Sequence, residues 1–379
     1  MTKEGFFSSN YLVDKTIYMK ADITNINNHI FNITPYEPGR PIEEVKRQFG
    51  LKSVLKLASN ENSLGPSPLA VSAIQKALIN VNRYPDGNCF YLKQKLAKKL
   101  GIGMKNIIFG NGSDEILDLI IKAFVNPKSD EIITSDITFL EYKITGQIFA
   151  VKVKEIPLRN FKYDLSKIKE AITKKTKLIC IANPNNPTGT YVNIKQFDEF
   201  LSSIPQDNIV VYDEAYAEFV DKDDFPYGMR YFREKNFIIL KTFSKIYGLA
   251  GLRLGYGITN ATFVEAMNRV RQPFNVNSIA QIAAIAALDD TAHIKLTQKV
   301  VWEGKRFLYE QFDKMGLDYI PTVTNFILVS IRKDVFGDLL KMGIIVRPMD
   351  MYGLNGYIRV TIGKEEENKK FINVLKKII

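Results

Sequence analysis

Short apolar runs alternate with amphipathic runs through the middle of the chain, and this alternation limits the folds that the sequence can adopt. "NIIFGNGSDEILDLIIKAF" (106–124) reads as a strand, a tight loop and a helix, and "SDEIITSDITFLEYKITGQIF" (129–149) repeats the pattern. Three further apolar runs, "TKLICIAN", "NIVVYDE" and "FIILKTFSK", each lead into a loop. Alternation of this kind favours a mostly parallel sheet covered by helices, so the predicted fold class is α/β.

The character of the chain changes after about residue 270. A long helical run (278–315), in which we allow for a break, precedes the strand-like stretches "NFILVSI" and "GYIRVTIG" and a last helix. Near the other end, "LKSVLKLASNENS" reads as an edge strand that enters a loop. We therefore predict an N-terminal extension (1–31), a large domain (62–270), and a smaller α+β domain built from both chain ends (32–61 and 271–379).

Five clusters of polar or aromatic side chains stand directly after predicted strands. In open parallel sheets, ligands bind in the crevice outside the carboxyl ends of the strands. The clusters are therefore expected to converge on one crevice, and this convergence carries more weight than any single motif. They are Gly110–Asp114, Phe139, Asn186, Asp213 with Tyr216, and Thr242–Lys245.

Composition excludes several other classes of protein. The chain has 52 Lys and Arg residues against 41 Asp and Glu residues, but the lysines are scattered along helix-like segments. This pattern indicates solvated helix faces and a mild preference for anionic small molecules rather than a nucleic-acid surface. The longest apolar stretch, near 282–288, is too short to span a membrane, and the N-terminus lacks the apolar core of a signal peptide.

Cysteine and histidine are too few and too far apart to form a metal site. Cys89 and Cys180 match no metal or disulfide spacing, and reduced thiols in the cytoplasm are the simplest interpretation. His29 and His293 are isolated, so we expect no zinc site and no catalytic arrangement of serine or cysteine with histidine.

"TFSKIYGLAGLR" (242–253) places Lys245 between hydroxyl groups just past a predicted buried strand. A partly desolvated lysine in such a position can act as a nucleophile toward a carbonyl group. Arg253 is either a neighbouring cation or a clamp for a phosphate. The spacing alone is weak evidence, because many lysines of a basic chain precede an arginine by chance.

Two further motifs extend this interpretation. In "GNGSDE" (110–115), the glycines allow backbone N–H groups to approach an anion, and Ser113 can cap the following helix, although the motif taken alone favours a simple well-capped loop. In "YDEAY" (212–216), Asp213 directly follows an apolar strand and needs a cationic or N–H partner. A pyridinium nitrogen is one such partner, and a structural Lys or Arg is the alternative.

Seven stretches, in this order, resemble the fold-type-I pyridoxal-phosphate aminotransferases. They are "KLASNENSLGPSP", "RYPDG", "GNGSDE", "NPNNPTG", "YDEAY", "TFSKIYGLAGLRLG" and "YIRVTIG". The resemblance covers roughly residues 30 to 379. "NPNNPTG" and "DEAY" are shared by many aminotransferases, whereas "LASNENSLGPSP", "RYPDG" and "RQPFNVN" narrow the resemblance to the histidinol-phosphate group of that family.

The resemblance implies a site for pyridoxal 5'-phosphate. Lys245 would bond the aldehyde of the cofactor and move the proton during catalysis, and Asp213 would keep the pyridine nitrogen protonated. Asn186 and Tyr216 would hydrogen-bond the 3-oxygen of the ring. Phe139, where the family commonly has a tyrosine, would stack on one face of the ring without the tyrosine's hydroxyl.

The remaining implied contacts surround the ring and its phosphate. Ala215 would pack on the second face of the ring. Tyr84 would reach the phosphate from a second subunit, which implies a homodimer with composite sites. The other phosphate contacts would be Gly112, Ser113, Asp114, Thr242, Ser244 and Arg253.

Arg359 matches the family's clamp for the substrate carboxylate or phosphate, and Arg347 and Tyr36 match further substrate contacts. The implied reaction is transamination of histidinol phosphate with 2-oxoglutarate, in histidine biosynthesis. Transamination of aromatic amino acids and decarboxylation of threonine phosphate, on the same scaffold, stay open. A transcription regulator would need more residues before Asn32 than the sequence has, and a nicotinamide oxidoreductase would need a glycine fingerprint that is missing.

Overall fold

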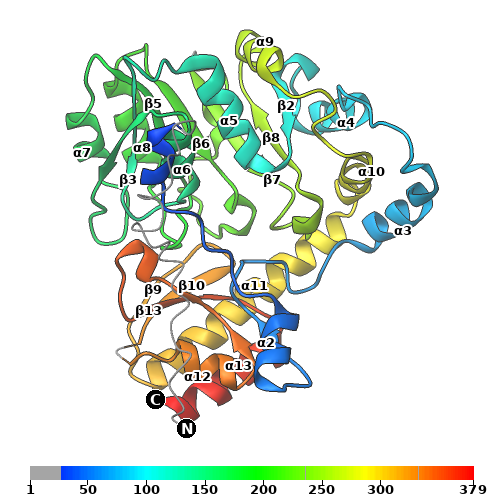
Figure 1. Ribbon diagram of the computed structural model, residues 1–379, viewed down its shortest axis with the longest axis vertical. Helices are drawn as coiled ribbons and strands as arrows, with labels where there is room; N and C mark the ends of the chain where they lie inside the picture. Colours follow the sequence, from blue (N-terminus) through cyan, green and yellow to red (C-terminus); the bar gives the residue numbers. More distant parts are fainter. Residues whose placement is uncertain (1–26, 235, 332) are drawn as a thin grey trace.

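The computed structural model describes residues 27–234, 236–331 and 333–379. A seven-stranded sheet forms the centre of its larger part, in the order β2-β8-β7-β6-β5-β3-β4 (Figure 1). Strands β3 to β7 run parallel to one another, whereas β8 is antiparallel to both β2 and β7. The fold is therefore α/β with a mostly parallel sheet, as the sequence predicts. The strands are β2 Ile107–Gly110, β3 Glu131–Ser135, β4 Lys152–Ile156, β5 Thr176–Ala182, β6 Ile209–Asp213, β7 Phe237–Thr242 and β8 Gly255–Ile258.

Five of these strands coincide with the apolar runs of the sequence, and two do not. Every residue of β2, β3 and β6 is buried, which explains why most of their residues are apolar or β-branched. The edge strand β4 contains two lysines and a glutamate among its five residues and is partly exposed. Strand β8 contains two glycines within four residues, and glycine is depleted in strands. These compositions explain why the pattern of apolar runs in the sequence did not predict β4 and β8.

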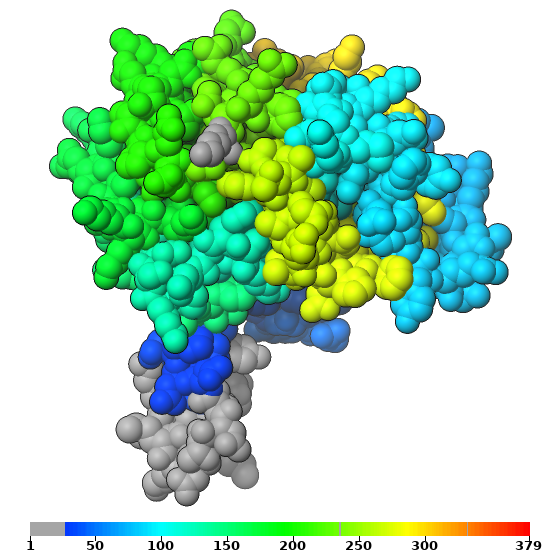
Figure 2. Space-filling model, turned by 90° about the horizontal axis from the view of Figure 1, so that it is seen from above, coloured from blue at the N-terminus to red at the C-terminus, as the bar shows by residue number. Residues whose placement is uncertain are grey.

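Helices cover the large sheet. They are α3 Pro68–Ala77, α4 Phe90–Leu100, α5 Gly112–Phe124, α6 Glu141–Ile148, α7 Leu165–Glu170, α8 Ile194–Ser203, α9 Ala261–Val270 and α10 Ser278–Ala287. Seen from above in Figure 2, the light blue and cyan segments form one flank, the green segments form the other, and the yellow-green segment lies between them.

The smaller part of the molecule holds the second sheet, in the order β12-β13-β10-β9. Its strands are antiparallel: β9 Tyr319–Ile320, β10 Phe326–Ser330, β12 Arg347–Pro348 and β13 Tyr357–Thr361. Its helices are α2 Ile42–Phe49, α12 Phe336–Lys341 and α13 Glu365–Ile378. The long α11 (Thr291–Lys314) joins the two parts, and the predicted break before it falls where Asp290 caps its first turn by accepting from the backbone N–H of His293 (3.1 Å).

The two ends of the chain meet in the smaller part. Strand β1 (Leu55–Lys56) pairs in parallel with β11 (Ile344–Ile345), and the backbone N–H of Thr361 then donates to the carbonyl of Leu57 (2.8 Å). In Figure 1, blue α2 accordingly lies beside the orange and red helices. The early edge-strand segment thus lies beside C-terminal strands, and its membership of one small domain with residues 271–379 stays a prediction. The exact domain boundaries stay a prediction, and most of the predicted extension (1–26) lies outside the described residues.

Candidate active site

One cavity of about 450 Å³ lies at the carboxyl ends of β5, β6 and β7, between the large sheet and the small one. That volume is typical of a small-molecule site. The cavity is lined by every residue that the sequence predicted for the site except Tyr84. These lining residues are Tyr36, Gly112, Ser113, Asp114, Phe139, Asn186, Asp213, Ala215, Tyr216, Thr242, Ser244, Lys245, Arg253, Arg347 and Arg359.

Lys245 lies in the loop that follows β7. Its Nζ atom donates to the carbonyl oxygen of Ser59 (3.3 Å) and lies 5.6 Å from the centre of the Tyr216 ring. The loop itself is held by the Thr242 hydroxyl, which accepts from the backbone N–H of Ser244 (3.0 Å). The amine therefore faces the cavity and forms no ion pair with any described residue. It is available to react with a carbonyl group.

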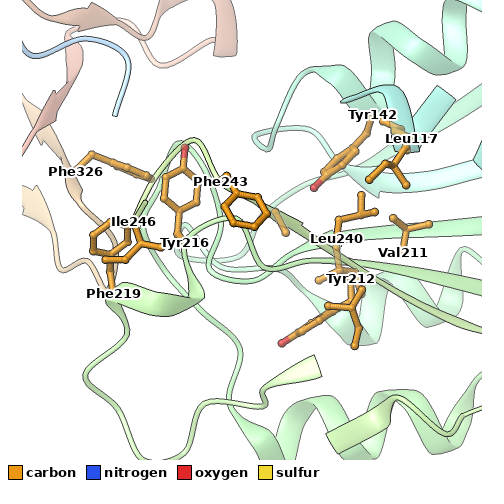
Figure 3. Close-up of a cluster of buried hydrophobic side chains, with 14 of the residues drawn as sticks. Leu117, Tyr142, Val211, Tyr212, Tyr216, Phe219, Leu240, Phe243, Ile246 and Phe326 are labelled. Atoms are coloured by element: carbon orange, nitrogen blue, oxygen red, sulfur yellow. The ribbon is translucent and has the colours of Figure 1, made fainter. Parts of the chain in front are cut away.

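Asp213 ends β6 at the floor of the cavity. Its carboxylate accepts hydrogen bonds from the Tyr142 hydroxyl (2.8 Å) and from the backbone N–H of Ala215 (3.0 Å). Burial raises the pKa of Asp213 to about 6, and these two hydrogen bonds oppose the rise. Figure 3 shows the phenol of Tyr142 near the strand ends, where it is fully enclosed. Among the described residues, Asp213 has no Lys or Arg partner, so the structural salt bridge considered from the sequence is absent there.

Asn186 and Arg359 form the opposite side of the cavity. One Nη atom of Arg359 donates to the Asn186 side-chain oxygen, and the other donates to the carbonyl oxygen of Ala58 (2.8 Å). Because the Asn186 oxygen is occupied, its amide nitrogen is left to donate into the cavity. The Arg359 side chain is buried, yet its Nε atom has no hydrogen-bond partner in the described chain.

A second arginine stands directly beside the first. Arg347 on β12 is the register partner of Arg359 on β13. Arg347 is also buried, donates to the carbonyl of Glu37 (2.6 Å), and lies with its guanidinium carbon 5.4 Å from the centre of the Tyr36 ring. Like charges directly opposite each other destabilise a sheet. Neither arginine forms an ion pair with a described residue, so this wall of the cavity is suited to an anion.

The first turn of α5 forms another anion-binding surface. Gly112 has a φ of +85°, and a side chain there would meet the Arg253 guanidinium at 2.7 Å. Arg253 is paired with Asp114 (2.8 Å), and both side chains are roughly half exposed. Gly112, Ser113 and Ser244 line the cavity beside this ion pair. The backbone N–H groups of a helix N-terminus, together with nearby hydroxyl groups, are suited to binding an anion.

Tyr84 is the one predicted residue that the structure does not place in the cavity. It is 84% exposed and stacks on Phe274, with ring centres 4.8 Å apart. The expectation that Tyr84 acts from a second subunit is compatible with this exposure and stays a prediction.

Several cavity residues were not predicted. Ser59 and Asn60 lie in the "KLASNENS" stretch, which carried the resemblance but no assigned role. Tyr352 and Glu141 stand in no recognisable motif. Burial raises the pKa of Glu141 to about 7, with a further contribution from Asp114 and Asp118.

No helix in the described ranges is long and apolar enough to cross a membrane. In the same ranges, no group of three or more His, Cys, Asp or Glu side chains could hold a metal ion.

Comparison with known proteins agrees with this architecture. The family model for aminotransferase class I and II matches residues 52–375, and the chain belongs to that family. A histidinol-phosphate aminotransferase of Moorella thermoacetica is 49% identical over 95% of this chain and 94% of its own length. The corresponding enzyme of Caldicellulosiruptor saccharolyticus is 48% identical over 92% of this chain and 99% of its own. The chain therefore belongs, more narrowly, among the histidinol-phosphate aminotransferases.

The structural comparison adds the cofactor. A histidinol-phosphate aminotransferase of Sinorhizobium meliloti, solved with pyridoxal 5'-phosphate, superposes with a TM-score of 0.85 at 27% identity, over 95% of this chain and 98% of that one. Pyridoxal phosphate is thus the cofactor of this family, and the cavity fits it. A buried carboxylate lacks a cation, an unpaired lysine amine faces the cavity, and a helix N-terminus lies at the far side.

Proposed function

We propose that the protein transfers the amino group of histidinol phosphate to 2-oxoglutarate in histidine biosynthesis. The observation that carries this proposal is the pair of buried arginines, Arg347 and Arg359, opposite each other on neighbouring strands without an acidic partner in the described chain. A guanidinium group can bind a carboxylate or a phosphate through two parallel hydrogen bonds. Two neighbouring guanidinium groups favour a phosphate over a carboxylate, because the phosphate carries more negative charge.

The chain's own groups divide the work of catalysis. Pyridoxal phosphate, when bound, supplies an aldehyde for amine exchange and a ring that withdraws electrons from the substrate carbon. The Lys245 amine holds the cofactor and then removes the proton from the amine-bearing carbon of the substrate. Asp213 keeps a proton at the ring nitrogen, and the Tyr216 hydroxyl and the Asn186 amide donate to the 3-oxygen. Arg359 and Arg347 orient the substrate through its anionic group.

Other cavity residues would hold and enclose the cofactor. Phe139 and Ala215 would enclose its ring. Its phosphate would be held by the α5 turn (Gly112, Ser113, Asp114) with Thr242, Ser244 and Arg253.

A comparison of amines tests the substrate. We expect histidinol phosphate with 2-oxoglutarate to give a much higher kcat/KM than phenylalanine or tyrosine with the same acceptor. Unphosphorylated histidinol should be poor, because both arginines are then left without their anion. If phenylalanine or tyrosine is preferred, the protein is an aromatic aminotransferase; if threonine phosphate releases carbon dioxide, it is a decarboxylase. Arg347→Gln is the matched variant, and it should lower the rate with histidinol phosphate more than the rate with phenylalanine.

We further propose a homodimer whose sites contain Tyr84 of the second subunit. The stretch that contains Tyr84, from α3 through to α4, exposes several large apolar side chains, and exposed apolar surface of this kind is typical of an interface. They include Leu69, Leu78, Ile79, Val81, Phe90 and Tyr91. In Figure 2 this region is the light blue and cyan flank.

A cytoplasmic location also stays a prediction from the sequence.

Subunit mixing tests the composite site. Lys245→Ala and Tyr84→Ala proteins, each inactive or weak alone, should regain activity when their subunits exchange, because one site of the mixed dimer is intact. If exchange is demonstrated and no activity returns, the sites are built within one chain.

A further inference from the structure

Residues 58–60, which follow β1, contact three side chains of the proposed active site. The carbonyl oxygens of the first two accept from Arg359 (2.8 Å) and from Lys245 (3.3 Å). The third residue, Asn60, donates from its side-chain nitrogen to the Tyr216 hydroxyl oxygen (2.9 Å). Within residues 58–60, the first two contacts are made by backbone carbonyl groups and only the third by a side chain. The third contact is therefore the one that a substitution in this segment can remove.

Asn60 is held in an unusual conformation. Its φ is +55°, in the left-handed region that asparagine tolerates better than most residues, and it is 1% exposed. Its backbone N–H donates to the Thr361 hydroxyl (2.9 Å), and its carbonyl accepts from Asn325 (3.0 Å). The Thr361 hydroxyl in turn donates to the Asn60 side-chain oxygen (3.4 Å). This contact orients the amide, so that its nitrogen faces Tyr216.

The orientation of the amide decides where the Tyr216 proton points. A phenol carries one proton and accepts through its lone pairs. Because the Asn60 amide donates to the oxygen, the Tyr216 proton cannot be directed at Asn60. The described residues provide no other acceptor for it, and Tyr216 lines the cavity. Its proton therefore points into the cavity.

We infer that Asn60 is a positioning residue, which directs the hydroxyl proton of Tyr216 toward the ring oxygen of the bound cofactor. Asn186 shows the same arrangement, since Arg359 occupies its oxygen and leaves its nitrogen to donate. Each of the two proposed donors to the ring oxygen is thus oriented by a donor behind it. The inference rests on the proposed role of Tyr216 but is independent of the substrate.

The colour of the bound cofactor reports this arrangement. A donor to the ring oxygen stabilises its ionised form and therefore lowers the pH at which the visible absorbance changes. The other groups that face Tyr216 across the cavity also influence this pH. They are Lys245, Asp213, Arg359, Arg347, Tyr36 and Tyr352. Each variant is therefore compared with a control that keeps all of them.

The experiment is a pH titration of the visible absorbance of the cofactor-loaded protein. Asn60→Gly accepts the left-handed backbone and removes the amide, so the midpoint should rise. Asn60→Asp has nearly the same shape but replaces the donor with an acceptor, so the midpoint should rise further, by about one pH unit, as for loss of a hydrogen bond to a charged group. In a Tyr216→Phe background, Asn60→Gly should give no further shift, because the two residues act as one unit.

Asn62→Gly is the matched control. Asn62 belongs to the same loop and donates to the carbonyl of Ile246 (3.0 Å) and to Thr297 (3.2 Å), but not to Tyr216. This variant should lower the melting temperature and leave the midpoint unchanged.

Three results would overturn the inference: an unchanged midpoint in Asn60→Gly, an equal shift in Asn62→Gly, or the same shift with and without the Tyr216 hydroxyl. If Asn60→Gly does not fold, Asn60→Asp alone decides between a raised and an unchanged midpoint. Because no substrate is used, a protein that rejects histidinol phosphate still tests this inference.

Discussion

Charged side chains are buried in two neighbouring places near the carboxyl ends of β6 and β7. Behind the cavity, Lys241 lies between Glu214 (3.2 Å) and Glu218 (2.9 Å). In the cavity, Asp213 and Arg359 are buried more deeply than Lys241 and Glu218, yet neither forms an ion pair with a described residue. Burial lowers the pKa of Lys241, but the two carboxylates outweigh it and hold that pKa well above its ordinary value.

The comparison distinguishes charged side chains that are paired within the fold from buried charged side chains that have no partner of opposite charge in the described chain. An unpaired buried charge is costly, so a chain that retains one needs another reason to keep it. Asp213 and Glu214 are consecutive residues at the end of a strand, where side chains alternate between faces. One therefore faces the cavity and the other the paired lysine behind it. Local departures from complete pairing are expected at functional sites.

The largest expected effect is on stability, and it follows from replacing the paired lysine, Lys241. Lys241→Met removes the cation and leaves two carboxylates buried together, which should lower the free energy of unfolding by about 4 kcal/mol. Urea unfolding measures this change. As a control, borohydride should still trap the cofactor on Lys245, as peptide mapping can show. A stable variant, or a label found on Lys241 in the wild-type protein, would remove the distinction between the two lysines.

Arg359→Gln tests the unpaired side. We expect kcat/KM for histidinol phosphate to fall about 100-fold, which corresponds to the loss of about 3 kcal/mol from a buried charge contact. The stability of the cofactor-free protein should not fall, because the arginine has no acid partner to leave behind. Arg359→Lys should not restore activity, since a point charge lacks the planar fork. Destabilisation comparable to that of Lys241→Met would show that Arg359 is structural.

The smallest effect concerns the pH dependence of stability. The Asp213 pKa is about 6 in the folded chain against an ordinary value of 3.8, so the cofactor-free folded state holds this proton more tightly. The resulting stabilisation is complete below pH about 4 and is lost as the pH rises through about 6. Between pH 5 and 7.5, the wild type should therefore lose about 1 kcal/mol more stability than Asp213→Asn. Urea titrations of both cofactor-free proteins at the two pH values give this difference, and equal losses would contradict the assignment.

Residue patterns alone brought together the groups proposed to bind the cofactor, but not those proposed to bind the substrate. Lys245, Asp213 and Asn186 each follow an apolar run, and the rule that strand ends converge is enough to bring them together. The register that sets Arg347 opposite Arg359 depends on a two-residue strand, whose composition gives no signal. Only the resemblance indicated that these arginines belong to the site.

The missed residues show a second limit of sequence reasoning. Tyr142 lies on a helix and reads as an ordinary core aromatic, because nothing local shows that its hydroxyl reaches Asp213. Asn60 lies in a polar loop, and its contact with Tyr216 spans 156 positions. The first contact depends on how α6 packs on the large sheet, and the second on how the segment after β1 is placed beside that sheet. Periodicity and turn signals describe neighbours in the chain, and they cannot supply that placement.

The hydrogen bond between Asn60 and Thr361 joins residues 301 positions apart, and it bears on how the protein is made. A ribosome releases the chain from its N-terminus, so Asn60 leaves the exit tunnel long before Thr361 is synthesised. Strand β1 has no partner until β11 emerges, and β13, which carries Arg359, is the last of the described strands to be made. The large sheet can form during synthesis, before the strands that carry Arg347 and Arg359 are made. A nascent chain can therefore assemble most of the residues proposed to bind the cofactor before it has the two arginines proposed to bind the substrate.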